Sequence, residues 1–214
     1  MFDASVERWR GLADNQAAWA SQRYGVAVDG SDLLALVKVE SGGNAAAVSP
    51  TGYRGLGQVG EAALSDYNNS DAGKVMPATW EQMRDPEAAH HQLRVVAWLV
   101  ANGRRAVAKW GYPDSKTNAV LWADARYAWG GGNIKAAVAE YQATHDGASP
   151  TFAQLAAFKP DAGKPNVRPW HHAIKVRDLA VADRGGVVPA GRSGVVLGLF
   201  VVALVVVLLA YALR

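Results

Sequence analysis

The chain has 214 residues, half of them hydrophobic and eight of them tryptophan, so it is long enough to bury a core without cross-links. It contains no cysteine, which excludes disulfides and thiolate metal sites. The formal net charge is +3, and the basic residues are scattered rather than arranged in a stripe, so we predict no specific nucleic-acid binding.

Residues 1–30 are predicted to form an N-terminal helical segment. Apolar residues recur there at helical spacing, namely Val6, Trp9, Ala13, Ala17, Ala20 and Tyr24. The first residues, MFDASVERWRG, have neither a basic n-region nor an apolar h-region. We therefore do not expect a secretory signal peptide in this sequence.

The next helix is predicted to begin after a Ser31 cap and to end before Gly42 and Gly43. Its apolar face carries Leu33, Leu36, Val37 and Glu40. Glu40 thus continues an apolar face at the end of a helix. A carboxyl held against apolar neighbours loses hydration of its charged form, which favours the protonated acid that can donate to a leaving group. The alternative is a glutamate that points to solvent from a frayed last turn.

The remainder of residues 31–182 is also predicted to be mainly helical. A second apolar stripe is formed by Leu93, Val96, Ala97 and Val100. Asn133 is expected to cap a helix that runs from Ile134 towards His145, and a final helix is expected over 170–182. Residues 49–69 are rich in Gly, Ser and Asn and could hold a short hairpin.

The last part of the chain differs in character. Residues 183–194, DRGGVVPAGRSG, are predicted to be a linker. Residues 195–213 are nineteen uncharged residues, about the length needed to cross a bilayer core as a helix. A buried core helix is the alternative, but the apolarity runs all round the helix. We predict a single C-terminal transmembrane-type helix.

Four short motifs carry a resemblance to a known family. Glu40-Ser41 is followed by Gly55-Leu56-Gly57-Gln58, and Met76-Pro77-Ala78-Thr79 comes after an insert of about sixteen residues. A Gly-rich element, YAWGGGNI, spans 127–134. Together these motifs resemble the lytic transglycosylases of the soluble, goose-lysozyme-like type.

The resemblance implies a mainly α, lysozyme-like α+β domain over 31–182 that acts on peptidoglycan without a cofactor or a metal. Glu40 would protonate the leaving oxygen and then draw the proton from the C6 hydroxyl of N-acetylmuramic acid, which gives a 1,6-anhydro end without water. The substrate contacts implied by the motifs are Ser41, Gln58, Tyr127, Trp129 and Trp170.

The chain departs from the family pattern at three positions. Gly57 stands where the family usually has Met, and Ala128 replaces an Asn. Trp170 is expected to take the place of a late tyrosine; it can stack on a sugar ring but has no hydroxyl to bond the catalytic carboxyl. These departures affect the choice of substrate rather than the acid itself.

Two other functions stay open from the sequence. A second carboxylate in the insert, at Glu61, Asp66 or Asp71, would make the enzyme a hydrolase. A degenerate lysozyme-like domain could instead serve as a structural or conduit protein. The pairs His90-His91 and His171-His172 are expected to be surface or partner-facing residues rather than metal ligands, because adjacent histidines on a helix point about 100° apart and do not readily share a metal.

The expected location follows from the substrate and the tail. Peptidoglycan lies outside the cytoplasmic membrane, and the sequence shows no export signal. A phage particle that delivers the protein to the host envelope during genome ejection resolves this, with the C-terminal helix bound to membrane or to other virion subunits. The alternative is a tail-anchored enzyme of the bacterial inner membrane.

Overall fold

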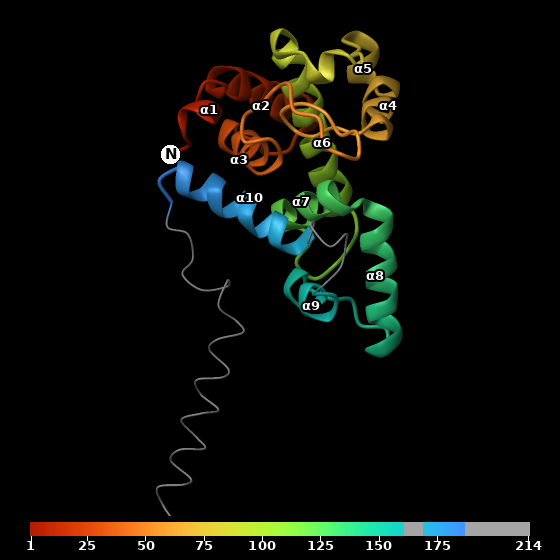
Figure 1. Cartoon of the computed structure of the whole chain (residues 1–214). Helices are drawn as coiled ribbons and strands as arrows, with labels where there is room; N and C mark the ends of the chain where they lie inside the picture. The colour runs from red at the N-terminus through yellow and green to blue at the C-terminus, as the bar shows by residue number, and fades with distance from the viewer. Residues whose placement is uncertain (161–168, 187–214) are drawn as a thin grey trace, which may run out of the picture.

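The computed structural model describes residues 1–160 and 169–186 (Figure 1). Within these ranges the chain is mainly helical, which confirms that part of the predicted fold class. The α-helices are α1 (Ala4–Glu7), α2 (Arg10–Tyr24), α3 (Gly30–Glu40), α4 (Glu61–Asn69), α5 (Asp71–Val75), α6 (Ala89–Ala108), α7 (Ala119–Trp129), α8 (Gly131–Thr144), α9 (Phe152–Phe158) and α10 (Pro169–Asp183). Two 3₁₀ turns, η1 (Gln82–Arg84) and η2 (Pro86–Ala88), precede α6.

The β component is small. The described residues form isolated antiparallel bridges between Val48 and Arg54 and between Arg54 and Val59, and no longer strand. The predicted hairpin over 49–69 is therefore limited to a tight loop, because the second half of that segment is the helix α4.

Two predicted N-caps are wrong. Asp29 caps α3 and forms a reciprocal capping box with Asp32, so the helix begins before Ser31, whose hydroxyl donates instead to Asp183 Oδ2 at 2.7 Å. Asn133 lies inside α8, and its side-chain amide donates to the Trp129 carbonyl at 2.6 Å. The end of α3 at Glu40 and the final helix are as predicted.

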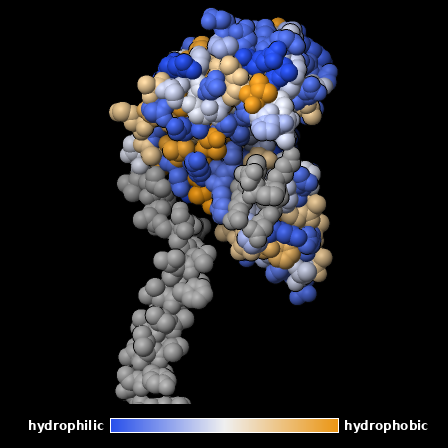
Figure 2. Space-filling view, in the orientation of Figure 1, coloured by the Kyte–Doolittle hydropathy of each residue, from blue (hydrophilic) through white to orange (hydrophobic). Residues whose placement is uncertain are grey.

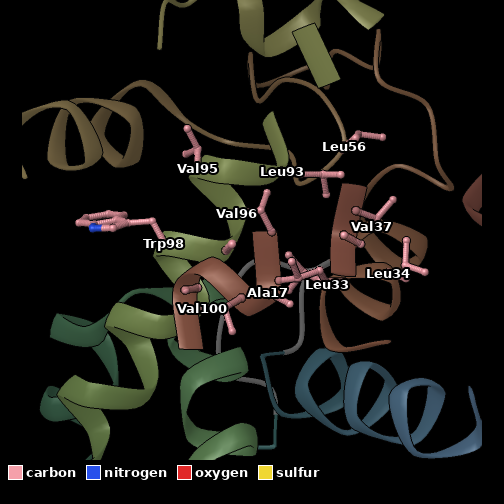
Figure 3. Packing of buried hydrophobic residues seen from close by; sticks show 14 of the residues in the cluster. Ala17, Leu33, Leu34, Val37, Leu56, Leu93, Val95, Val96, Trp98 and Val100 are labelled. Atoms are coloured by element: carbon pink, nitrogen blue, oxygen red, sulfur yellow. The ribbon is translucent and has the colours of Figure 1, made fainter. Parts of the chain in front are cut away.

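One apolar core joins α2, α3 and α6. Figure 3 shows its centre, where side chains of α3 lie against those of α2 and α6. Its fully buried members include Ala17, Leu33, Leu34, Val37, Leu93 and Val96. This packing explains why α3 is regular to its last residue, since nearly every side chain before Glu40 is buried.

A second core, rich in aromatic residues, joins α7, α8 and α9. Trp122, Ile134, Phe152 and Leu155 are buried in it. Helix α10 packs against α7 and α3 and belongs to both cores, with Ala173 in the second and Val176 in the first (Figure 1). The residues around position 172 therefore lie where the two cores meet.

Ion pairs fix the C-terminal end of α10 to the starts of α2 and α3. Arg184 pairs with Asp32 at 3.0 Å, and Arg10 pairs with Asp183 at 2.7 Å. Asp32 also pairs with Arg104 of α6 at 2.9 Å. Since Asp32, Arg104 and Asp183 are largely buried, these contacts hold the helix ends together more firmly than exposed pairs would.

The surface seen in Figure 2 is mixed, with hydrophobic residues in separate patches among hydrophilic ones. No helix in residues 1–160 and 169–186 is long and apolar enough to cross a membrane. The predicted transmembrane-type helix at 195–213, and most of the predicted linker at 183–194, lie outside the described residues.

Candidate active site

Glu40 is the last residue of α3, and its side chain is 19% exposed. The helix stops there because Gly42 and Gly43 adopt positive φ angles of 62° and 89°. At Gly43 a side chain has no room, since an added Cβ would lie 2.3 Å from the Ser5 carbonyl oxygen. The close approach of α1 thus fixes the turn that leaves Glu40 at a helix end.

The carboxyl of Glu40 contacts α10. Nε2 of His172 lies 2.8 Å from Oε1 of Glu40, and the His172 side chain is only 10% exposed. We did not predict this contact, and the expectation that both histidines of the 171–172 pair are surface or partner-facing residues is wrong for His172. His171 is exposed, as expected for a neighbour about 100° away on the helix.

A sequence signal for His172 was present. It lies four residues before Val176 and eight before Ala180, both of which are buried, so it continues the apolar stripe of α10. Glu40 extends the stripe of α3 in the same way. The two polar side chains that interrupt an apolar stripe are the two that meet.

Ser41 joins the end of α3 to the Gly55–Gln58 loop. Its hydroxyl donates to the Leu56 carbonyl at 2.9 Å and accepts from the Gly43 amide at 3.2 Å. The structure therefore places Ser41, predicted as a substrate contact, beside Glu40 with its hydroxyl bonded to main chain.

Buried Gln92 of α6 holds the same loop from the other side. Its Oε1 accepts from the Leu56 amide at 2.8 Å, and its Nε2 donates to the carbonyls of Ala45 and Asp85 at 3.0 and 2.9 Å. Gln58, the other predicted contact in the loop, has a positive φ of 47°, and its side-chain amide bonds back to Gly55. No local pattern indicates the role of Gln92, because its partners lie far along the chain.

Tyr127 of α7 contacts the Gly55–Gln58 loop. Its hydroxyl donates to the Gly57 carbonyl at 2.6 Å. Burial raises the pKa of Tyr127 well above its ordinary value, and the nearby carboxyls of Glu40 and Asp124 raise the pKa further, so the hydroxyl stays a donor. Tyr127 therefore lies near the carboxyls of Glu40 and Asp124, and its contact with substrate stays a prediction.

The space around position 57 favours glycine over any residue with a side chain. A Cβ there would lie 2.3 Å from Cγ2 of Val96 and 2.9 Å from the Tyr127 hydroxyl. A methionine, which the family usually has at this position, would therefore meet Val96 and Tyr127 in this arrangement.

The two predicted tryptophans have different surroundings. Trp129 is partly buried and lines a surface depression of about 430 Å³ with Asn133, Glu140 and Lys159. Trp170 is 2% exposed, packs edge-on against Trp129 at 5.7 Å, and donates from its indole nitrogen to the Lys159 carbonyl at 2.7 Å. Trp170 is a core residue in this structure, so its ring has no free face for a sugar.

Asp124 is a further buried polar group, which we did not predict. It lies one turn before Tyr127 on α7 and is 3% exposed. Burial raises the pKa of Asp124 to about 7, against the opposing charges of Arg104 and His172. Glu40, His172, Asp124 and Tyr127 therefore form one cluster, drawn from α3, α10 and α7.

The other titratable residues singled out in the sequence lie elsewhere. Glu61, Asp66 and Asp71 are exposed on α4 and α5, and within the described ranges no hydrogen bond or ion pair joins them to Glu40. The rings of His90 and His91 pack on each other at 4.1 Å. Across 1–160 and 169–186, no group of three or more His, Asp or Glu could hold a metal ion.

Residues 17–147 match the family model described as the Transglycosylase SLT domain. This range includes Glu40 and Tyr127 but ends before α10, so His172 is outside it. No curated protein matches the chain.

Proposed function

The chain belongs to the SLT transglycosylase family and is a lytic transglycosylase of peptidoglycan, and from this premise we propose that Glu40 is the single general acid and base of its reaction. The bond cleaved is the β-1,4 linkage between N-acetylmuramic acid and N-acetylglucosamine. The observation that carries the proposal is the placement of Glu40, a mostly buried carboxyl at a helix end that is oriented through one oxygen by His172.

The reaction has two proton transfers on the same carboxyl. Protonated Glu40 gives its proton to the glycosidic oxygen, and the bond from C1 of the muramic acid to that oxygen breaks with the electron pair leaving on the oxygen. The Glu40 carboxylate then takes the proton of the C6 hydroxyl while O6 bonds to C1. The proton count is restored, no water is consumed, and the product has a 1,6-anhydro ring.

His172 and Tyr127 support this cycle in different ways. Because His172 bonds Oε1 of Glu40, and no hydrogen bond among the described residues engages Oε2, the second oxygen is the one offered to substrate. Tyr127 fixes the Gly57 carbonyl and so the loop that follows the glutamate. Trp129, on the rim of its depression, is the aromatic side chain best placed for a sugar contact.

The alternative of a hydrolase requires a second carboxylate that activates water. The three acidic residues of the insert are exposed, while Asp124 is buried away from bulk water. The distinction is tested by digesting purified peptidoglycan and analysing the ends by mass spectrometry. We expect anhydro-muramic ends; reducing ends, each with one added water, would replace the proposal by hydrolysis. A protein that cleaves nothing would have a structural role.

We also propose that the enzyme is carried in a phage particle and reaches the host envelope during genome ejection, with residues 195–213 as its attachment to membrane or to other virion subunits. The uncharged run at 195–213 and the location of peptidoglycan outside the cytoplasmic membrane support this. Immunoblotting of purified virions and of inner membranes from uninfected cells tests it. Detection in the inner membranes alone would favour a tail-anchored bacterial enzyme.

A further inference from the structure

Asp124 is a buried carboxyl that the two proton transfers above do not use. It is nine-tenths or more buried, and its Oδ2 has no hydrogen-bond partner within the part of the chain that the structure describes. An unpartnered carboxylate at this depth is costly, because burial penalises the charge. The neutral carboxylic acid, which carries an O–H donor, is the form that such surroundings favour.

His172 has an atom that could accept a hydrogen bond from Asp124. Its Nε2 faces Glu40, while its Nδ1 is buried and has no hydrogen-bond partner among the described residues. Helices α7 and α10 pack side by side (Figure 1), and the charge of His172 acts on Asp124. The two unpartnered atoms therefore belong to neighbouring side chains, one able to donate a hydrogen bond and the other able to accept it.

We propose that Asp124 is a positioning residue of the transglycosylase reaction: in its protonated form it donates through a water molecule to Nδ1 of His172, so that Nε2 keeps its hydrogen and donates it to Glu40. The inference rests on the proposed function of Glu40. A hydrogen bond at one ring nitrogen sets which nitrogen of a neutral imidazole carries the proton. With the His172 Nε2–H bonded to Oε1, the proton of the Glu40 carboxyl is held on Oε2, the oxygen offered to substrate.

The remaining charged groups around Asp124 do not take this role. Arg104 of α6 pairs with Asp32 of α3 at 2.9 Å, and its Nε is also buried without a hydrogen-bond partner among the described residues. A guanidinium can only donate, so it cannot accept the hydrogen of a protonated Asp124. Tyr127, on the same helix as Asp124, donates its hydroxyl to the Gly57 carbonyl. Only His172 among these neighbours has both an unpartnered atom and a contact with Glu40.

The arrangement makes the site sensitive to pH near neutrality. Burial holds the pKa of Asp124 at about 7, so the donor is present below that pH and is lost above it. Once ionised, Asp124 instead attracts a proton to Nδ1 of His172. His172 then presents an Nε2 without a hydrogen to Glu40, and Oε1 of Glu40 loses its hydrogen-bond donor.

The test compares Asp124→Asn, whose amide can still donate, with Asp124→Leu, which has a similar size and no donor. The matched control is Asp178→Asn, which removes a partly exposed carboxyl of α10 that pairs with Arg177. The rate of anhydro-end formation is measured from pH 5 to 9, with unfolding curves for each variant. The tautomer of His172 is read by nitrogen-15 NMR of the full chain.

We expect Asp124→Leu to lose about tenfold or more in kcat at pH 6, a typical effect of removing a residue that orients a catalytic group. Asp124→Asn should keep most of the rate, and its loss of activity on the alkaline side should move to higher pH. Wild-type His172 should be in the Nε2–H form at pH 6 and should change form in the leucine variant. Asp178→Asn should match the wild type.

The proposal is overturned if a folded Asp124→Leu has the wild-type rate and pH profile, or if Asp124→Asn has the wild-type profile. If the leucine variant does not fold, the asparagine profile and the wild-type tautomer decide. These results are distinct from failure of the proposed function, which would appear as absence of anhydro ends in the wild type or as an active Glu40→Gln.

Discussion

Nε2 of His172 lies 2.8 Å from Oε1 of Glu40, although the two residues are 132 positions apart in the chain. Each is at a point where a polar side chain continues an otherwise apolar stripe, one at the end of α3 and the other near the start of α10. The contact places the carboxyl that we propose as catalytic against a helix that follows the matched family region.

Glu40→Gln should abolish cleavage of peptidoglycan with little effect on folding. The amide is nearly the same size but cannot give and then retrieve a proton, so we expect a loss of about 10²–10⁴-fold or more. Release of soluble fragments from purified peptidoglycan measures the rate, and circular dichroism checks the fold. Near-normal activity of this variant would remove Glu40 from the mechanism.

His172→Gln and His172→Leu should differ from each other. The glutamine amide can still donate to Glu40 and should retain more activity, whereas leucine leaves the carboxyl without its orienting bond. We expect the leucine variant to lose about 10–100-fold in kcat, as when a residue that orients a catalytic ligand is removed. The measurement is kcat and KM for each variant, and equal rates for the two would argue against an orienting role.

Gly57→Ala should destabilise the protein, because the added Cβ would lie 2.3 Å from Cγ2 of Val96. Overpacking of this kind costs about 1–3 kcal/mol in the free energy of unfolding. Urea unfolding measures the effect. In Gly57→Ala/Val96→Ala the clash with Val96 is removed, so the double variant should be less unstable than the sum of the single changes predicts.

Gln92→Leu should be among the most destabilising single changes. It leaves the Leu56 amide without its acceptor and removes the donor shared by the carbonyls of Ala45, Gln82 and Asp85. Each unsatisfied buried group costs about 1–3 kcal/mol. The control is Gln142→Leu, which removes a single bond to Ser149. A Gln92→Leu protein as stable as that control would contradict the role of Gln92 in holding the loop.

Asp124→Asn should change how stability depends on pH. The pKa of Asp124 is raised from 3.8 to about 7 in the folded state, so the folded protein binds the extra proton and its stability falls as pH rises between these values. A tenfold change in proton affinity corresponds to about 1.4 kcal/mol, so the loss is on the order of a few kcal/mol. Thermal unfolding from pH 4 to 8 should show a smaller decline in the variant, and an unchanged decline would assign the pH dependence to other groups.

The parts of the site that could be predicted are those encoded locally. The position of Glu40 follows from an apolar stripe that ends at two glycines, and both signals are within a dozen residues. The N-cap of α3 was misassigned for a local reason. Asp29 and Ser31 are both residue types that cap helices, and Asp29 is the cap because it forms a reciprocal capping box with Asp32. Local rules give the helix but do not choose between two adjacent capping side chains.

The parts that could not be predicted depend on long-range packing. Nothing near Trp170 shows that Phe152 and Trp129 surround it, so an aromatic residue at that position is equally consistent with a sugar platform and with a core side chain. Gln92 likewise resembles an exposed polar residue until the loop that it bonds is in place. The burial of these side chains depends on which helices pack together, and the residues next to them in the sequence do not indicate that packing.

The two contacts between α3 and α10 make the length of the last helix a fixed quantity. Near its start α10 meets α3 through His172 and Glu40, and just after its end Arg184 meets Asp32 at the opposite end of α3. One residue inserted between 173 and 182 would turn one end relative to the other by about 100° and displace it by about 1.5 Å. Only one of the two contacts could then be kept. We therefore expect α10 to tolerate substitutions between 173 and 182 far better than insertions or deletions there.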